Sequence, residues 1–103
     1  MATPPVDIGT LIIRKPGVRG GRPHIAGTGV SLRTIVYMQR EGLTPDEMVR
    51  RMPHLSHVHV YAALAHYYAN KEEVDTEMAE LEAEETRLEE ELLARLARQQ
   101  LVR

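Results

Sequence analysis

The stretch that most constrains the fold runs from residue 71 to residue 100, thirty residues that contain neither glycine nor proline. Charged side chains dominate it, and apolar residues recur at spacings of three, four and seven, interrupted by Glu85. This periodicity predicts one long amphipathic helix with a narrow apolar stripe. Such a helix is too polar to be buried all round, so it either projects and pairs with a partner or lies along its own domain. The stripe comprises Val74, Met78, Leu81, Leu88, Leu92 and Leu96.

The net charge of −2 is unevenly divided along the chain. Residues 1–71 carry nine Lys or Arg against four Asp or Glu, a net charge of +5, and hold all five histidines. Residues 72–103 carry four Arg against eleven Asp or Glu, a net charge of −7. This asymmetry predicts a basic domain over 1–71 and an acidic amphipathic helix over 72–103, with two surfaces for two partners. A solvated acidic helix without a partner is the alternative.

Composition argues against several classes of protein. The chain has no cysteine, which excludes disulfides and thiolate metal sites. Its apolar runs are far shorter than the ~20 residues of a membrane span. The start MATPPVDIGT lacks the basic and apolar regions of a signal peptide. We therefore expect a cytoplasmic protein with no membrane partner.

A short β-hairpin is expected over residues 11–27. The sequence LIIR (11–14) is apolar and β-branched, which favours a strand, and RPHIAG (22–27) is a second extended piece. Between them, KPGVRGG (15–21) contains Pro-Gly and Gly-Gly pairs that favour a turn. Because two strands alone are unstable in water, they must pack on helices or pair with another chain.

Three short helices are expected after the hairpin, over residues 32–41, 45–52 and 56–69. Ser31 and Ser56 are placed to cap the first and third of them. TPDE (44–47) supplies a capping threonine, a proline at the first helical position and a glutamate two positions later. The predicted fold class is therefore mainly α, with a short N-terminal β-hairpin, a three-helix module and a long C-terminal amphipathic helix.

The second and third of these helices, joined by the turn PHL (53–55), have the arrangement of a helix-turn-helix. That motif presents the N-terminal residues of its second helix to base edges in the major groove, and nearby arginines contact phosphates. A compact three-helix packing with no nucleic-acid role would produce the same pattern. On the DNA-binding interpretation, the contacting residues are Arg22, Arg33, Arg50, Arg51, Ser56, His57, His59 and Tyr61.

Other site chemistries match the sequence poorly. The stretch GRPHIAGTG (21–29) lacks the lysine of a P-loop and the third glycine of a dinucleotide fingerprint, so we interpret it as tight turns. His57 and His59 are expected on different helix faces, and no Asp or Glu lies between residues 48 and 71, so no metal site is expected. Without a base beside a nucleophile, we expect neither catalysis nor a cofactor.

Four motifs occur in a fixed order. GRPHIAGT (21–28) is followed by GLTPDE (42–47), PHLS (53–56) and AALAHYY (62–68). Over roughly residues 11–75 this series resembles the family known as domain of unknown function 433. Gly29 departs from the arginine that usually follows glycine-threonine. The resemblance implies a winged or plain helix-turn-helix module, often dimeric, similar to VapB-type antitoxins that neutralise a PIN-like ribonuclease toxin.

The resemblance and the charge division together indicate the antitoxin of a type II toxin-antitoxin pair. A homodimer would bind two half-sites of operator DNA about one helical turn apart and act as a transcription repressor. The acidic helix would cover the basic RNA groove of the toxin. An assembly or adaptor protein that binds no DNA, and whose long helix self-associates, is the alternative. The expected toxin-binding residues are Met78, Leu81, Glu85, Leu88, Leu92 and Leu96.

Overall fold

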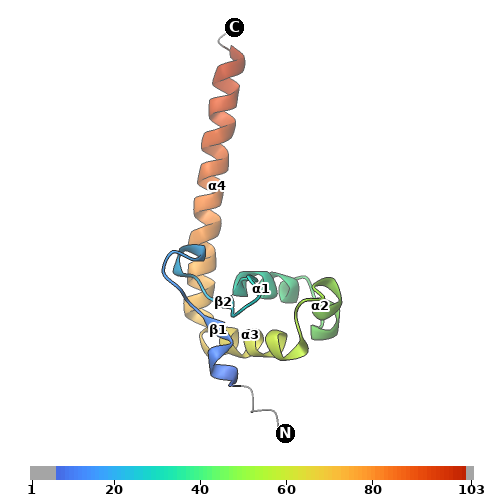
Figure 1. Ribbon diagram of the computed structural model, residues 1–103. Helices are drawn as coiled ribbons and strands as arrows, with labels where there is room; N and C mark the ends of the chain where they lie inside the picture. The colour runs from blue at the N-terminus through green and yellow to red at the C-terminus, as the bar shows by residue number, and fades with distance from the viewer. Residues whose placement is uncertain (1–6, 102–103) are drawn as a thin grey trace, which may run out of the picture. The chain divides into compact units, whose positions relative to one another are not determined.

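The computed structural model describes residues 7–101. The chain divides into two compact units, Met1–Lys71 and Glu72–Arg103. The described part is mainly helical with a short two-stranded antiparallel hairpin near its N-terminal end, as the sequence predicts (Figure 1). With η denoting a 3₁₀ turn, the elements are η1 (Ile8–Thr10), β1 (Ile12–Ile13), η2 (Arg19–Gly21), β2 (His24–Ile25), α1 (Leu32–Arg40), α2 (Pro45–Arg51), α3 (His57–Ala69) and α4 (Lys71–Leu101).

The hairpin is shorter than the predicted strands. Each strand has only two residues, with Ile12 opposite Ile25 and Ile13 opposite His24. His24 also forms an antiparallel bridge to Ser31, which brings the start of α1 against β2. Pairing stops here because Gly27 has a φ of 75°, a left-handed conformation that turns the chain away from the strand direction.

The loop between β2 and α1 is closed by its own hydrogen bonds. The Ile25 N–H donates to the carbonyl of Val30 (2.8 Å), and the Thr28 N–H donates to the carbonyl of Ile25 (3.3 Å). The Val30 N–H donates to the Thr28 side-chain hydroxyl at 3.1 Å. These amides are used inside the loop, so they do not form a phosphate cradle, and the loop serves to position α1.

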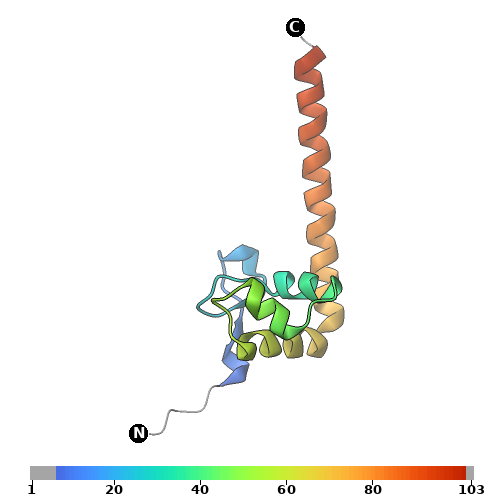
Figure 2. The ribbon, with the colours of Figure 1, turned by 90° about the vertical axis from the view of Figure 1, so that its right-hand side faces the viewer.

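The core of the amino-terminal unit lies between α1, α3 and the short sheet. α3 packs against α1, α2 and β1, while α1 also contacts β2. Both ribbon views show α1 and α3 side by side (Figures 1 and 2). The chain has no Phe or Trp, so aliphatic side chains and Met supply most of this core. The buried apolar residues of this unit are Ile25, Val30, Leu32, Ile35, Val36, Met38, Met48, Leu55, Val60, Ala62, Ala63 and Tyr67.

Local side-chain caps start the three short helices. The hydroxyl of Ser31 accepts the N–H of Thr34 (3.3 Å), that of Thr44 accepts the N–H of Glu47 (3.2 Å), and that of Ser56 accepts an N–H in the same way. These bonds satisfy amides that have no partner within the first turn. The predicted caps of all three helices are confirmed.

None of the helices within residues 7–101 combines the length and the apolarity needed to cross a membrane. α4 is the longest of them, and its 31 residues are rich in charge.

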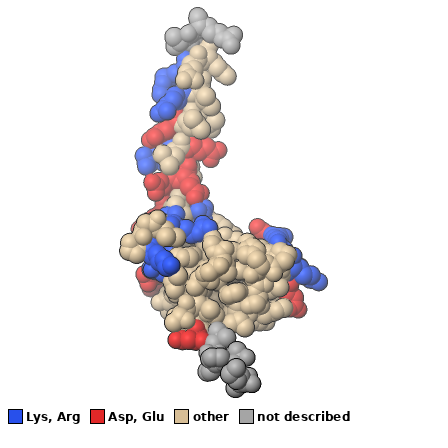
Figure 3. Space-filling view, viewed as in Figure 1, with Lys and Arg blue, Asp and Glu red and all other residues tan. Residues whose placement is uncertain are grey.

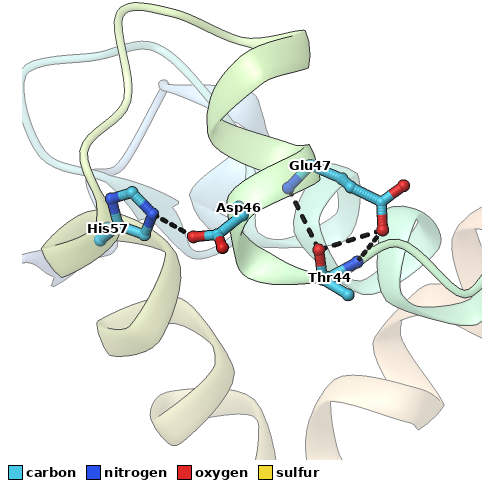
Figure 4. A network of polar contacts seen from close by, with 4 residues as sticks. All are labelled: Thr44, Asp46, Glu47 and His57. Atoms are coloured by element: carbon cyan, nitrogen blue, oxygen red, sulfur yellow. Dashed lines mark hydrogen bonds and ion pairs between the residues drawn. The ribbon is translucent and has the colours of Figure 1, made fainter.

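The capping box of α2 gives a testable pH dependence. The carboxylate of Glu47 accepts hydrogen bonds from the Thr44 N–H (3.1 Å) and the Thr44 hydroxyl (3.0 Å) (Figure 4). The backbone bond from Thr44, then the side-chain bond, and then the charges of Arg50 and Arg51 lower the pKa of Glu47 below its ordinary value of 4.5. A lowered pKa means that the ionised group stabilises the folded state above pH 4.5, and that this contribution disappears as the pH falls through the folded-state pKa.

We predict that Glu47→Gln lowers the free energy of unfolding at neutral pH, and that the difference from the wild type vanishes under strongly acid conditions. Urea denaturation across a pH series measures both. Glu80→Gln, a change at an exposed position of α4, should show no such trend. A difference for Glu47→Gln that persists unchanged in acid would contradict the role of the carboxylate.

Candidate functional site

A close polar contact links α2 and α3, which also pack against each other. His57 Nε2 lies 2.6 Å from Asp46 Oδ1, which connects the first turn of α3 to the first turn of α2 (Figure 4). Both side chains are exposed, so the pair contributes modestly, about 0–1 kcal/mol. Its main effect is to orient the His57 ring toward α2.

Ser56 and His59 form a capping box at the start of α3. The Ser56 N–H donates to His59 Nδ1 at 3.1 Å, and the His59 N–H donates to the Ser56 hydroxyl at 3.3 Å. Because a backbone N–H can only donate, Nδ1 must be unprotonated, and a neutral ring then carries its proton on Nε2. Ser56 and His59, both expected to contact DNA, are therefore hydrogen-bonded to each other, and the Nε2–H of His59 remains as a donor.

The exposed side of α3 has neither basic Lys or Arg nor acidic side chains. The segment 57–69 contains no Lys, Arg, Asp or Glu. Val58, Tyr61 and Tyr68 are each about half exposed on it. Tyr61, which the sequence assigns to DNA contact, is thus accessible, although its neighbours on this face are apolar.

The arginines expected at the phosphates have different surroundings. Arg50 is exposed at the end of α2, and Arg51 beside it donates to Glu41 Oε2 at 3.1 Å in an exposed ion pair. Arg33 is half-buried, and its Nε donates to the Tyr37 hydroxyl at 3.1 Å, with the guanidinium 5.1 Å from the Tyr37 ring centroid. Arg50 and Arg51 are therefore better placed for a phosphate than Arg33.

The hairpin forms a second basic region. Arg22 is half-buried and its guanidinium lies close to Gly20, where a Cβ would be 3.2 Å from Nη1. Arg14 Nη1 donates to the Gly21 carbonyl at 3.2 Å, and Arg19 donates to the carbonyl of Gly29. Figure 3 shows Lys and Arg over the hairpin and over α2, with a broad uncharged area of the amino-terminal unit between them.

The docking residues expected on α4 fall into two groups. Met78 is buried and Leu81 is half-buried. Glu85 and the leucines that follow it are exposed, with Leu88, Leu92 and Leu96 at 50%, 53% and 46%. Arg87 Nη1 donates to Glu91 Oε1 at 3.2 Å along the surface of the helix. The second half of α4 therefore presents apolar side chains to solvent.

Within residues 7–101, no three His, Asp or Glu side chains gather closely enough to hold a metal ion. The four histidines between residues 54 and 66 are separated: His59 caps α3, His57 contacts Asp46, His54 is exposed and His66 is half-buried.

Asp46 and Tyr37 are the residues of this region that sequence reasoning missed. The sequence assigns Asp46 only to a helix start, and its bond to His57 depends on how α2 packs against α3. Tyr37 follows Arg33 by four positions on α1, and side chains with this spacing are neighbours on a helix. The hydrogen bond between Arg33 and Tyr37 could therefore have been predicted from the sequence.

Comparisons with known proteins identify the family. The family model described as "Protein of unknown function (DUF433)" matches residues 12–68. The chain is also similar to a solved structure, the crystal structure of a DUF433 member protein from Anabaena variabilis ATCC 29413. That similarity has a TM-score of 0.61 and 32% sequence identity, and it covers 67% of this chain and 68% of the other. No curated protein matches the chain. With more than half of its residues matched by the family model, the chain belongs to the DUF433 family.

Proposed function

We propose that this protein is the antitoxin of a type II toxin-antitoxin pair, a cytoplasmic, non-enzymatic protein with one surface for operator DNA and another for a PIN-like ribonuclease toxin. The observation that carries the proposal is the leucine face exposed on the acidic helix α4, attached to a unit with a net charge of +5. A basic unit favours nucleic acid, and an acidic helix with exposed leucines favours a basic protein groove.

In this proposal α2 and α3 act as the two helices of a helix-turn-helix. α3 would enter the major groove with its first turn toward the bases, where Tyr61 and Val58 suit the methyl group of thymine better than a hydrogen-bonded base edge. Arg50 and Arg51 would contact the phosphates, because Arg50 is exposed and the exposed Arg51–Glu41 pair costs little to break. A homodimer would place two such helices on two half-sites.

The protein-binding half of the proposal rests on α4. The toxin contact would use Leu88, Leu92 and Leu96, with Glu85 and the neighbouring carboxylates facing basic residues of the RNA groove. Burial of an exposed leucine contributes about 1.5–3 kcal/mol, so a few such side chains can carry an interface.

The DNA contact is tested by the double change Arg50→Ala with Arg51→Ala. We expect weaker binding to DNA from upstream of the protein's own gene, and a salt dependence of log Kd whose slope is reduced by about two, one for each lost phosphate contact. Fluorescence anisotropy with a labelled duplex at several salt concentrations measures both quantities.

Lys15→Ala is the matched control, since it removes an exposed positive charge of the same unit that is not assigned to DNA contact. An unchanged slope in the double variant would remove Arg50 and Arg51 from the DNA contact. No binding of the wild type to any upstream fragment would overturn the DNA-binding half of the proposal.

A second candidate function is an assembly or adaptor protein without DNA binding. The half-exposed face of α3, which has no Lys, Arg, Asp or Glu, favours it, because recognition helices normally present polar or basic side chains to the bases. Failure to bind DNA together with stable self-association would support this function over the first.

A further inference from the structure

The exposed half of α4 has a charge polarity along its axis. Residues 82–91 hold six Glu and one Arg, whereas residues 92–101 hold two Arg and no Asp or Glu. Figure 3 shows both signs of charge along this helix. A helix that is acidic at one end of a segment and basic at the other is complementary to its own copy only when the two run in opposite directions.

One side of the same segment has the spacing of a coiled-coil seam. Leu81, Glu85, Leu88, Leu92 and Arg95 follow one another at intervals of four, three, four and three, which places them along one side of a helix. Leu88 and Leu92 are 50% and 53% exposed, and Glu85 and Arg95 are exposed beside them. Glu85 lies three residues before Leu88, and Arg95 lies three residues after Leu92. Two charges of opposite sign therefore flank the leucine pair.

We infer that α4 pairs with α4 of a second copy in an antiparallel register, about a two-fold axis level with Glu90. In this register the residue numbers of facing positions sum to 180. Leu88 then faces the partner's Leu92, and Glu85 faces the partner's Arg95. Each contact occurs twice because the interface is isologous.

Other alignments of the two helices do not form these leucine and Glu–Arg contacts. A parallel pair places Glu85 against the partner's Glu85 and Arg95 against the partner's Arg95, which repels twice. A shift of the antiparallel pair by one heptad places Glu85 against the partner's Leu88, which buries a carboxylate against an apolar side chain. The inferred register avoids both costs over residues 81–99, a length of about 28 Å.

The charged residues on either side of the seam are also compatible with this register. Glu84 approaches the partner's Arg98, again with opposite charges. Close to the axis, Glu91 approaches the partner's Glu91, and the bond from Arg87 to Glu91 within each helix offsets that repulsion. The side chain of Arg95 has no hydrogen bond or ion pair within the described residues, so its guanidinium is available to a second copy.

The inference goes beyond the proposed function and does not depend on a toxin or on DNA. The self-paired face includes Leu88 and Leu92, so a toxin bound there would compete with the second copy. The pairing is therefore measured on the full chain alone. A monomeric chain would remove the homodimer from the antitoxin proposal, whereas the DNA and toxin contacts keep their own tests.

Charge reversal in the full-length protein tests the register. Sedimentation equilibrium should show a reversible dimer for the wild type that weakens with added salt. Glu85→Arg alone and Arg95→Glu alone should each raise the dimer Kd by about tenfold or more, since two attractive contacts become repulsive. The double variant Glu85→Arg with Arg95→Glu should restore the Kd to within about threefold of the wild type. Glu90→Arg makes the same charge change on the opposite side of the helix, and it should have a smaller effect than Glu85→Arg.

Cysteine pairing tests the orientation, because the chain has no cysteine of its own. The double variant Glu85→Cys with Arg95→Cys should form a covalent dimer on oxidation, whereas Glu85→Cys alone should not. A wild type that stays monomeric at several hundred micromolar, a dimer that is insensitive to both charge reversals, or cross-linking of Glu85→Cys alone would overturn the inference.

Discussion

Replacement of Ile35 by alanine is expected to destabilise the amino-terminal unit by about 2–5 kcal/mol. Ile35 is fully buried on α1, the helix that contacts both β2 and α3. The substitution removes apolar contacts and leaves a cavity that the surrounding side chains fill only in part. Because a domain of this size has a stability of about 5–15 kcal/mol, the loss is a large fraction of the total.

The measurement must report on this unit and exclude the helical signal of α4. All four tyrosines lie between residues 37 and 68, so near-ultraviolet circular dichroism during urea denaturation follows the amino-terminal unit. Ile8→Ala is the matched control, because Ile8 is 60% exposed and the same chemical change there should cost less than about 0.5 kcal/mol. Equal effects of the two substitutions would show that the core is not centred on α1.

The starts of the short helices could be predicted because a helix cap is a local interaction. Ser31, Thr44 and Ser56 each bond an amide three residues further along the chain, so residue type and spacing are sufficient. The partner of Ser56 could also have been found in this way. His59 occupies the position that a glutamate fills in the usual capping box, and its Nδ1 accepts the same backbone N–H.

Interactions between helices could not be predicted from the same patterns. Asp46 and His57 are eleven positions apart on different helices, and their contact exists only once α2 packs against α3. The burial of His24 has a similar origin, because the residue lies in a short strand between β1 and the start of α1. Sequence patterns locate such residues on an element, but the packing of several elements determines what they contact.

The candidate DNA surface illustrates the consequence for function. Sequence position placed Arg33, Ser56 and His59 near the same groove, whereas their side chains bond Tyr37 or each other. Arg50 and Tyr61 are exposed, as a contact residue must be. The α4 leucines needed less tertiary information, because a polar helix with a narrow stripe leaves that stripe exposed wherever no partner covers it.

The largest functional effect is expected from the double change Leu88→Asp with Leu92→Asp. Under the antitoxin proposal, both leucines become buried against the toxin, and each contributes about 1.5–3 kcal/mol there. Their replacement by charged side chains should weaken the complex by at least about two to four orders of magnitude and abolish neutralisation.

Co-expression with the PIN-like toxin that the proposal expects from an adjacent reading frame measures the effect, through rescue of growth and co-purification of the two proteins. Leu93→Asp is the control, because it introduces the same charge at a position that is 57% exposed. Leu93 is one residue beyond Leu92, so its side chain is rotated by about 100° around the helix axis from that of Leu92. Rescue should be retained in this control and lost in the double variant. Equal loss in both would indicate a general effect of charge on α4, and full rescue by the double variant would place the toxin contact on another surface. The tyrosine signal of the amino-terminal unit should be unchanged in all three proteins, since the substitutions lie outside that unit.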